Sequence, residues 1–213
     1  MPRTAGPFAN LDERALQALA PHGVARTFPR SVVVVHEGDM TDALYVVLAG
    51  RVKAYATGED GREMVLHIIG AGDYFGELVL DGGARSASVI TLEPCRLFLM
   101  PRGDVESLLD RDPAFARDLI AKLIGLVRSL SDKVLDLGQK DVYGRFVRFI
   151  DENAIEREGT CVVPERLTQQ EIAARIGGSR EMVSRIISEL TVGGYISIDA
   201  KRITVHRKLP THR

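Results

Sequence analysis

The spacing of apolar positions changes twice along the chain, and each change marks a different kind of element. The first residues predict a short helix, ended by Pro21-His22-Gly23, because four apolar side chains share one helical face: Leu11, Ala15, Leu16 and Leu19. Residues 27–100 form short apolar runs separated by turns, and several runs alternate with period two, as in Val52-Lys53-Ala54-Tyr55. Such alternation is typical of half-buried strands. Residues 27–100 therefore predict a compact antiparallel β-roll or barrel.

A helical period replaces this alternation after Pro101. Residues 113–137, PAFARDLIAKLIGLVRSLSDKVLDL, carry two adjacent apolar rows: Leu119, Leu123, Leu126, Leu130 and Leu137, and beside them Ile120, Ile124, Val127 and Val134. A helix of this length extends about 37 Å. Because its apolar stripe is longer than one β-roll can cover, we expect it to pack against a second copy in a homodimer. The alternative is a helix folded back on its own domain.

The C-terminal third combines helices with short strands. Residues 141–156, DVYGRFVRFIDENAIE, predict a helix, and residues 160–168, TCVVPERLT, predict a short strand. Apolar residues alternate on both sides of Asp199-Ala200-Lys201, which predicts a small hairpin: Ile196, Ile198, Ile203 and Val205.

These changes of pattern divide the chain into three expected segments. They are a β-roll domain over residues 1–110, a long helix over 111–138 and a small helical domain over 139–213. The net charge of −1 divides into −3 for residues 1–140 and +2 for residues 141–213. That basic excess is small, so a nucleic-acid partner would depend on where the basic groups lie more than on their number.

The most specific motif lies in residues 167–190, LTQQEIAARIGGSREMVSRIISEL. Thr168 and Glu171 have the spacing of a capping box, so a helix is expected to begin there. Gly177-Gly178 predicts a tight turn, and Ser179 is a favourable N-cap for a second helix. A helix, a short Gly-containing turn and another helix together make a helix-turn-helix.

The second helix of this motif has two contrasting faces. One face is apolar and is expected to pack inward: Val183, Ile186, Ile187 and Leu190. The opposite face carries Arg180, Glu181, Ser184 and Arg185. Arg can donate two hydrogen bonds to guanine, and Glu can accept one from cytosine, so this face suits a DNA major groove. The alternative is a solvated face with contacts between residues four apart.

Together these elements resemble the cyclic-AMP receptor / fumarate-nitrate regulator (Crp/Fnr) family of bacterial transcription regulators. The resemblance covers almost the whole chain and rests on FGEL with ARSA, SDKVLDL, DVYGRF and the helix-turn-helix segment. It implies an α+β fold with an N-terminal cyclic-nucleotide-binding β-roll, a long dimerisation helix and a C-terminal winged helix-turn-helix. It also implies that one set of residues reads bases of a TGTGA-like half-site and another holds phosphates: Arg180, Glu181 and Arg185, and Thr168, Gln170 and Ser179.

The resemblance places a cyclic nucleotide in residues 75–89, FGELVLDGGARSASV, which we call the cassette. Glu77 can accept a hydrogen bond from a ribose hydroxyl, and Arg85 can pair with the cyclic phosphate. Ser86 and backbone amides would add donors. Gly76, Gly82 and Gly83 permit the unusual backbone conformations that a phosphate cradle needs. The expected ligand contacts are Gly76, Glu77, Leu78, Arg85 and Ser86, with Leu130 and Ser131 on the long helix. The alternative is an unliganded loop held by a Glu77–Arg85 salt bridge.

Two departures from the family pattern bear on the effector. The interval of eight residues from Glu77 to Arg85 is shorter than in the usual cassette, and Leu130-Ser131 stands where the cyclic-AMP receptor has Thr-Ser. Leu130 has no group to bond a base, so the base preference can differ. Cyclic AMP is the leading candidate effector. Cyclic GMP, cyclic di-GMP, an unrelated effector and a ligand-independent regulator stay open.

Other cofactors and functions find less support in the sequence. Cys95 and Cys161 are far apart, and this argues for free thiols and against an Fe–S cluster or a structural zinc site. His67 lies in an apolar strand pattern, where a structural role is commoner than haem or metal ligation. We expect a cytoplasmic protein that is not an enzyme, with double-stranded DNA and RNA polymerase as partners. A cupin-like sugar-binding protein or enzyme with an appended helical domain is the alternative class.

Overall fold

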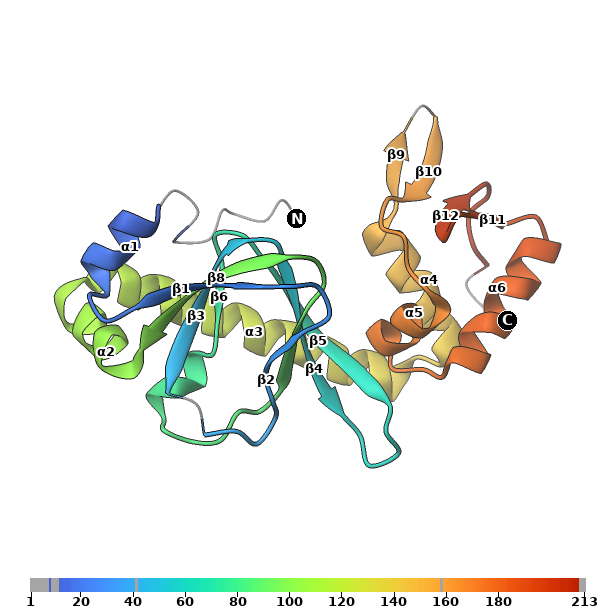
Figure 1. Ribbon diagram of the computed structural model, residues 1–213. Coiled ribbons are helices and arrows are strands. Elements are labelled where there is room, and N and C mark those ends of the chain that lie inside the picture. The colour runs from blue at the N-terminus through green and yellow to red at the C-terminus, as the bar shows by residue number, and fades with distance from the viewer. Residues whose placement is uncertain (1–7, 9–11, 41, 158, 211–213) are drawn as a thin grey trace. The chain divides into compact units, whose positions relative to one another are not determined.

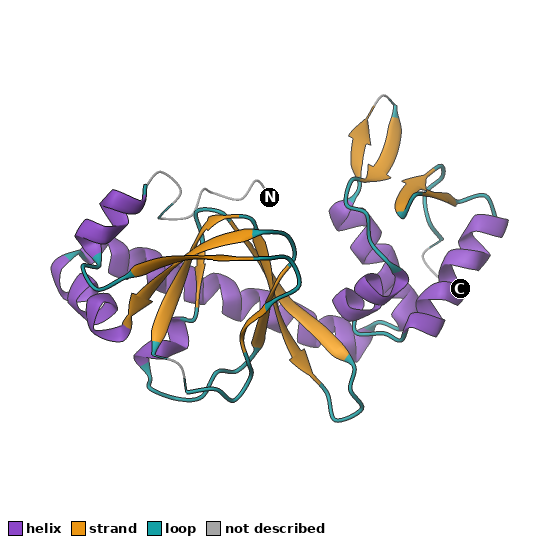
Figure 2. Ribbon diagram, in the orientation of Figure 1, coloured by secondary structure: helices purple, strands orange, loops and turns teal. Residues whose placement is uncertain are grey.

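The computed structural model describes residues 8, 12–40, 42–157 and 159–210 (Figure 1). The chain forms two compact units, one of residues 1–56 and 66–128, the other of residues 57–65 and 129–213. Strands dominate the first unit, whereas helices and a small sheet make most of the second (Figure 2). No helix in the described ranges is long and apolar enough to cross a membrane.

Helices flank the strands of the N-terminal unit. The predicted short helix is confirmed as α1 (Glu13–Leu19), capped by Asp12, whose side chain accepts a 2.8 Å hydrogen bond from Ala15 N. Leu16 is fully buried, whereas Leu11 lies outside the described residues. The predicted long helix is α3 (Pro113–Gln139), which follows α2 (Arg102–Arg111).

Two four-stranded sheets build the β-roll, as predicted, with the strand orders β1-β8-β3-β6 and β2-β7-β4-β5. The described pairings are antiparallel. The single turn of 3-10 helix η1 (Glu77–Leu80) lies inside the cassette. The strands are β1 (Val24–Phe28), β2 (Val33–Val35), β3 (Ala43–Ala49), β4 (Arg51–Thr57), β5 (Glu63–Gly70), β6 (Tyr74–Phe75), β7 (Ser88–Thr91) and β8 (Cys95–Pro101).

The central strand β3 is buried on both faces, and its alternation creates two hydrophobic clusters. Leu44 and Val46 pack with residues of β8, α2 and the start of α3. Tyr45 and Val47 point to the other side and join a cluster inside the roll. Phe115 and Leu119 belong to the first cluster, so they fix the beginning of α3 to the roll.

The C-terminal unit places helices beside a third sheet, of order β11-β12-β10-β9. Its predicted hairpin is confirmed, with Ile198 opposite Ile203 and positive φ angles at Ala200 and Lys201 in the turn. The strand predicted over residues 160–168 is confirmed only in its first part, as β10, and residues 164–168 are not strand. The elements are α4 (Val142–Asn153), β9 (Ile155–Arg157), β10 (Thr160–Val163), α5 (Gln169–Ile176), α6 (Arg180–Val192), β11 (Ile196–Asp199) and β12 (Arg202–Val205).

The prediction of one helix over residues 141–156 is wrong at its C-terminal end. Helix α4 stops at Asn153, and Ile155–Arg157 pairs with β10 as strand β9. The backbone of Ala154 is extended, and its amide caps the helix by bonding Ile150 O. The inward face of α4 ends with Phe149 and Ile150, and the next inward positions are Asn153 and Ala154, so a further helical turn would bury no large apolar side chain.

Candidate nucleic-acid interface and ligand cassette

The helix-turn-helix is built from local signals that the sequence carries. Thr168 Oγ1 accepts from Glu171 N at 3.1 Å, and the Glu171 carboxylate accepts from Thr168 N at 2.6 Å, so the predicted capping box is confirmed. Gly177 ends α5 in the left-handed conformation with φ 64°. Ser179 then caps α6 by accepting from Met182 N at 3.2 Å.

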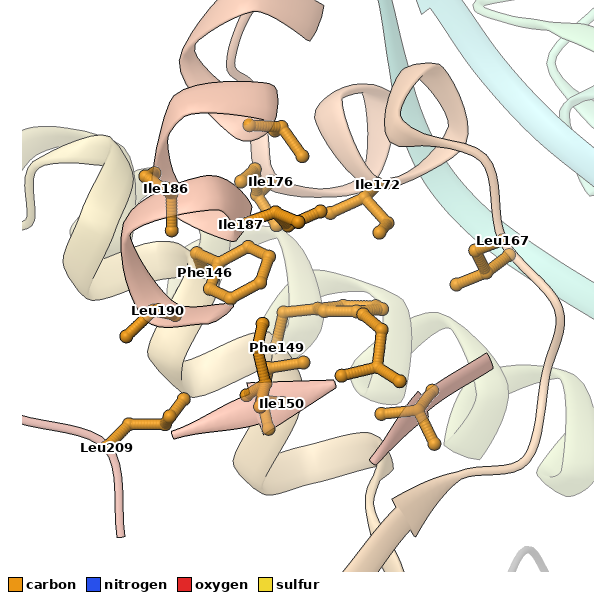
Figure 3. Close-up of a cluster of buried hydrophobic side chains, with 14 of the residues drawn as sticks. Phe146, Phe149, Ile150, Leu167, Ile172, Ile176, Ile186, Ile187, Leu190 and Leu209 are labelled. Carbon is orange, nitrogen blue, oxygen red and sulfur yellow. The ribbon is translucent and has the colours of Figure 1, made fainter. Parts of the chain in front are cut away.

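The apolar face of α6 is buried, as predicted. Val183, Ile186, Ile187 and Leu190 are each less than 8% exposed. They join one hydrophobic cluster with side chains of α4 and α5, including Phe146 and Ile176 (Figure 3). This packing fixes the rotation of α6 about its axis, so the opposite face must point to solvent.

The outward face of α6 carries the predicted base-reading residues. Arg180, Glu181 and Arg185 are exposed and line one shallow groove. The same groove includes Ser184, which was predicted on this face, and three residues that were not: Gln169, Ser188 and Glu189. Ser188 and Glu189 follow Ser184 and Arg185 by four residues, so a longer helical wheel would have included them.

A second groove lies between α5, α6 and the β11–β12 hairpin. It is lined by Thr168, Gln170 and Arg180, all predicted contacts, and by Lys201 at the hairpin turn. Leu167 N donates to Lys201 O at 3.1 Å, which ties the hairpin turn to the start of α5. Lys201 was not among the predicted contacts, although a basic residue in this hairpin turn was a visible signal.

The two capping hydroxyl groups are already engaged within the motif. Thr168 Oγ1 donates to Glu171 Oε2 at 2.7 Å, and Ser179 hydrogen-bonds the Glu181 carboxylate. Burial acts to raise the pKa of Glu171, but the hydrogen bonds from Thr168 outweigh it and lower the net value. The pKa of Glu181 is also lowered, by its own backbone amide and by Ser179. Both carboxylates therefore favour their ionised forms.

Arg85 closes the cassette. Its side chain is 5% exposed, and it donates from Nη1 to Gly76 O at 2.8 Å and from Nη2 to Ala43 O at 2.5 Å. Gly76 has φ 88°, and a Cβ there would lie 3.0 Å from Arg85 Nη1. Burial lowers the pKa of Arg85, although the guanidinium stays ionised at neutral pH. The planar fork of an arginine has the geometry that suits a phosphate or carboxylate.

The other predicted cassette residues differ in exposure. Glu77 is half-buried, whereas Leu78 and Ser86 are exposed. Gly82 has a positive φ angle of 71°, as expected for the cradle, but Gly83 does not. Ser88, a cassette residue that was not predicted as a contact, is buried and accepts a 3.0 Å hydrogen bond from Glu37 N.

Helix α3 carries Leu130 and Ser131, and both side chains are exposed. An apolar stripe continues along the helix with exposed fractions from 39% to 68%: Ile120, Leu123, Ile124, Val127, Leu130, Val134, Leu135 and Leu137. Large apolar side chains gathered in this way on one helix are typical of a surface that a partner covers.

Two family models match the chain. A model of the cyclic nucleotide-binding domain matches residues 25–112, and one of the Crp-like helix-turn-helix domain matches residues 144–208. The CRP-like cAMP-activated global transcriptional regulator of Mycobacterium tuberculosis is 32% identical over 206 residues, which cover 94% of this chain and 92% of that protein. The chain belongs to the Crp/Fnr family of transcription regulators.

Solved structures of similar proteins agree with this assignment to the Crp/Fnr family. The c-di-GMP-responsive global regulator CLP of Xanthomonas campestris superposes with a TM-score of 0.80 at 26% identity, covering 92% of this chain and 100% of CLP. The Crp/Fnr regulator TTHA1359 of Thermus thermophilus gives 0.70 at 27% identity, covering 86% and 94%. The chain is thus a Crp-like DNA-binding transcription regulator with a cyclic nucleotide-binding domain, and its relatives differ in effector.

The residues considered as ligands of haem, an Fe–S cluster or a metal ion lie in three different strands: His67, Cys95 and Cys161. His67 is half-buried in β5. Cys95 is a buried free thiol that contacts Arg51 O and Glu93 O, and Cys161 is an exposed free thiol in β10. Within the described ranges, no three His, Cys, Asp or Glu residues gather in a way that could hold a metal ion.

Proposed function

We propose that this Crp/Fnr protein is a homodimeric, sequence-specific regulator whose DNA affinity is set by a cyclic nucleotide, with cyclic AMP as the leading effector. The observation that carries the proposal is the pair of faces on α6. Its buried apolar face holds the helix in place, and its exposed face presents Arg180, Glu181 and Arg185 around one groove. A TGTGA-like half-site offers guanines and cytosines to these groups.

The proposed phosphate contacts follow from the positions of three residues in the helix-turn-helix. Thr168, Gln170 and Ser179 lie at the starts of α5 and α6, where backbone amides and the helix dipole favour a phosphate. The domain division into residues 1–110, 111–138 and 139–213 stays a prediction. RNA polymerase is the proposed protein partner, the cytoplasm the proposed location, and no catalytic role is proposed.

In the cassette, Arg85 would pair with the cyclic phosphate and Glu77 with the ribose, with Gly76, Leu78 and Ser86 around them. Buried Arg85 supports this role, because a guanidinium held by two carbonyls is preorganised for an anion. Leu130 and Ser131 would face the base. Leu130 supplies no hydrogen bond, and CLP is c-di-GMP-responsive, so cyclic di-GMP is the second candidate effector.

The homodimer is proposed from the exposed apolar stripe of α3. A second copy of α3 would cover this stripe and pair two recognition helices about 34 Å apart on a palindrome. Light scattering tests the dimer, and selection of bound duplexes from a random library tests sequence-specific reading. Enrichment of a palindrome with TGTGA-like halves is expected. A monomer, or a pool without enriched sequence, would contradict the proposal.

A further inference from the structure

One guanidinium joins the end of the long helix to the turn of the helix-turn-helix. Arg145, in the first turn of α4, donates from Nε to Ile176 O at 2.7 Å and from Nη2 to Gly177 O at 3.1 Å. Its Nη1 donates to Lys140 O at 2.6 Å. These residues all belong to the C-terminal unit.

The three carbonyls lie at the C-terminal ends of two helices. Ile176 and Gly177 end α5, and Lys140 follows the last residue of α3, with its amide still bonded to Asp136 O. Carbonyls at such ends lack partners within the helix, and the helix dipole gives them negative character. A planar guanidinium suits these carbonyls. Its fixed N–H donors supply the missing hydrogen bonds, and its permanent positive charge complements their negative character.

Close packing reinforces this junction. A Cβ added at Gly177 would lie 2.9 Å from Leu137 Cδ2 in the last turns of α3. A Cβ added at Gly178 would lie 2.9 Å from Val142 Cγ1 in α4. Because the turn packs closely against both helices, we expect a shift at the end of α3 to move residues 177–179, and α6 begins at the next residue.

We propose that Arg145 is the positioning residue that orients the recognition helix α6 relative to the end of α3. It contacts no base, and it acts by fixing the turn from which Arg180 and Glu181 project. The inference rests on the proposed reading of DNA by α6. It predicts that loss of Arg145 lowers discrimination between DNA sequences more than it lowers general affinity for DNA, because the proposed phosphate contacts at the start of α5, Thr168 and Gln170, do not depend on Arg145.

Arg148 provides a matched control on the same helix. It also joins α3 to α4, through Nη1 to Asp136 Oδ2 at 2.6 Å, and its Nε contacts Glu152 Oε1 at 2.6 Å. Replacing Arg148 removes the same charge and weakens the same helix junction. Its described partners do not include the turn at Gly177, so the orientation of α6 should be kept.

The experiment compares Arg145→Gln, Arg145→Lys and Arg148→Gln in the full-length protein. Duplexes selected by the wild type from a random library, and scrambled versions of them, are titrated by fluorescence anisotropy. For Arg145→Gln, the ratio of selected to scrambled affinity should fall about tenfold or more, as for a lost base contact. The ratio for Arg145→Lys should lie between those of Arg145→Gln and the wild type. The ratio for Arg148→Gln should stay within about threefold of the wild-type ratio.

The outcomes distinguish the positioning role of Arg145 from the proposed reading of DNA by α6. An unchanged ratio in Arg145→Gln, or an equal fall in Arg148→Gln, would overturn the role of Arg145 while leaving DNA reading intact. A wild type without preference for selected duplexes would overturn both. Circular dichroism melting checks folding, and if Arg145→Gln does not fold, Arg145→Lys decides the test, because the single ammonium nitrogen of lysine cannot reproduce the fork that places three nitrogens on three carbonyls. A ratio for Arg145→Lys equal to that of the wild type would then overturn the proposal.

Discussion

Arg85 and Gly76 hold the two ends of the cassette together: Arg85 Nη1 donates a 2.8 Å hydrogen bond to Gly76 O, across nine positions of sequence. The contact requires glycine, because Gly76 has φ 88° and a Cβ would lie 3.0 Å from Nη1 and 3.1 Å from Ala43 O. The structure thus joins two residues that were predicted as separate ligand contacts into one preorganised unit.

Gly76→Ala should therefore weaken both the fold and ligand binding. A left-handed non-glycine residue costs about 1–3 kcal/mol, and the methyl group also displaces Arg85. The measurement is urea unfolding combined with calorimetric titration of cyclic AMP. Gly61→Ala is the control, because Gly61 also has positive φ but a Cβ there would meet open space. Equal cyclic AMP affinities in both variants would contradict the role of the Gly76–Arg85 contact.

Arg85→Ala should lower stability as well as ligand binding. It leaves the carbonyls of Gly76 and Ala43 without their donors, and a buried unsatisfied group costs about 1–3 kcal/mol. Arg96→Ala, which removes an exposed arginine paired with Glu13, should change the free energy of unfolding by about 1 kcal/mol or less. Unfolding free energies measured in urea check both values. An Arg85→Ala protein as stable as the wild type would show that the two carbonyl bonds contribute little.

Two tyrosines allow a test of buried hydroxyl groups. Tyr74 is fully buried in a cluster with Phe8 and Phe115, and its hydroxyl finds no hydrogen-bond partner in the described part of the chain. Burial raises its pKa. Tyr143 instead donates from its hydroxyl to Pro210 O at 3.0 Å. Tyr74→Phe should leave the melting temperature unchanged or higher, and Tyr143→Phe should cost about 1 kcal/mol. A marked fall in the melting temperature of Tyr74→Phe would show that the Tyr74 hydroxyl has a hydrogen-bond partner.

The capping box should make the free energy of unfolding depend on pH in the acid range. Because the net pKa of Glu171 is lowered in the fold from its ordinary value near 4.5, the ionised form stabilises the folded state. Its contribution is therefore complete above pH 4.5 and is lost as the pH falls through the lower folded value. In Glu171→Gln the unfolding free energy should fall less steeply below pH 4.5 than in the wild type. Parallel pH profiles would contradict this role of the Glu171 carboxylate.

Local chemistry made the helix-turn-helix predictable. The capping box of Thr168 and Glu171, the turn at Gly177 and the buried face of α6 depend on residues within a few positions of one another. Strand β9 was missed because its hydrogen bonds come from β10, beyond the expected helix. The carbonyl partners of Arg85 and Arg145 were equally hidden. Backbone acceptors leave no mark in a sequence, and Ala43 lies 42 positions from Arg85.

The most direct test of the whole account is DNA affinity with and without the effector. Fluorescence anisotropy of a TGTGA palindrome is measured for the wild type and Arg85→Lys, with a scrambled duplex as reference and cyclic AMP absent or saturating. The account predicts a preference for the palindrome that cyclic AMP strengthens in the wild type and strengthens much less in Arg85→Lys. Equal affinity for both duplexes, with and without cyclic AMP, would contradict it.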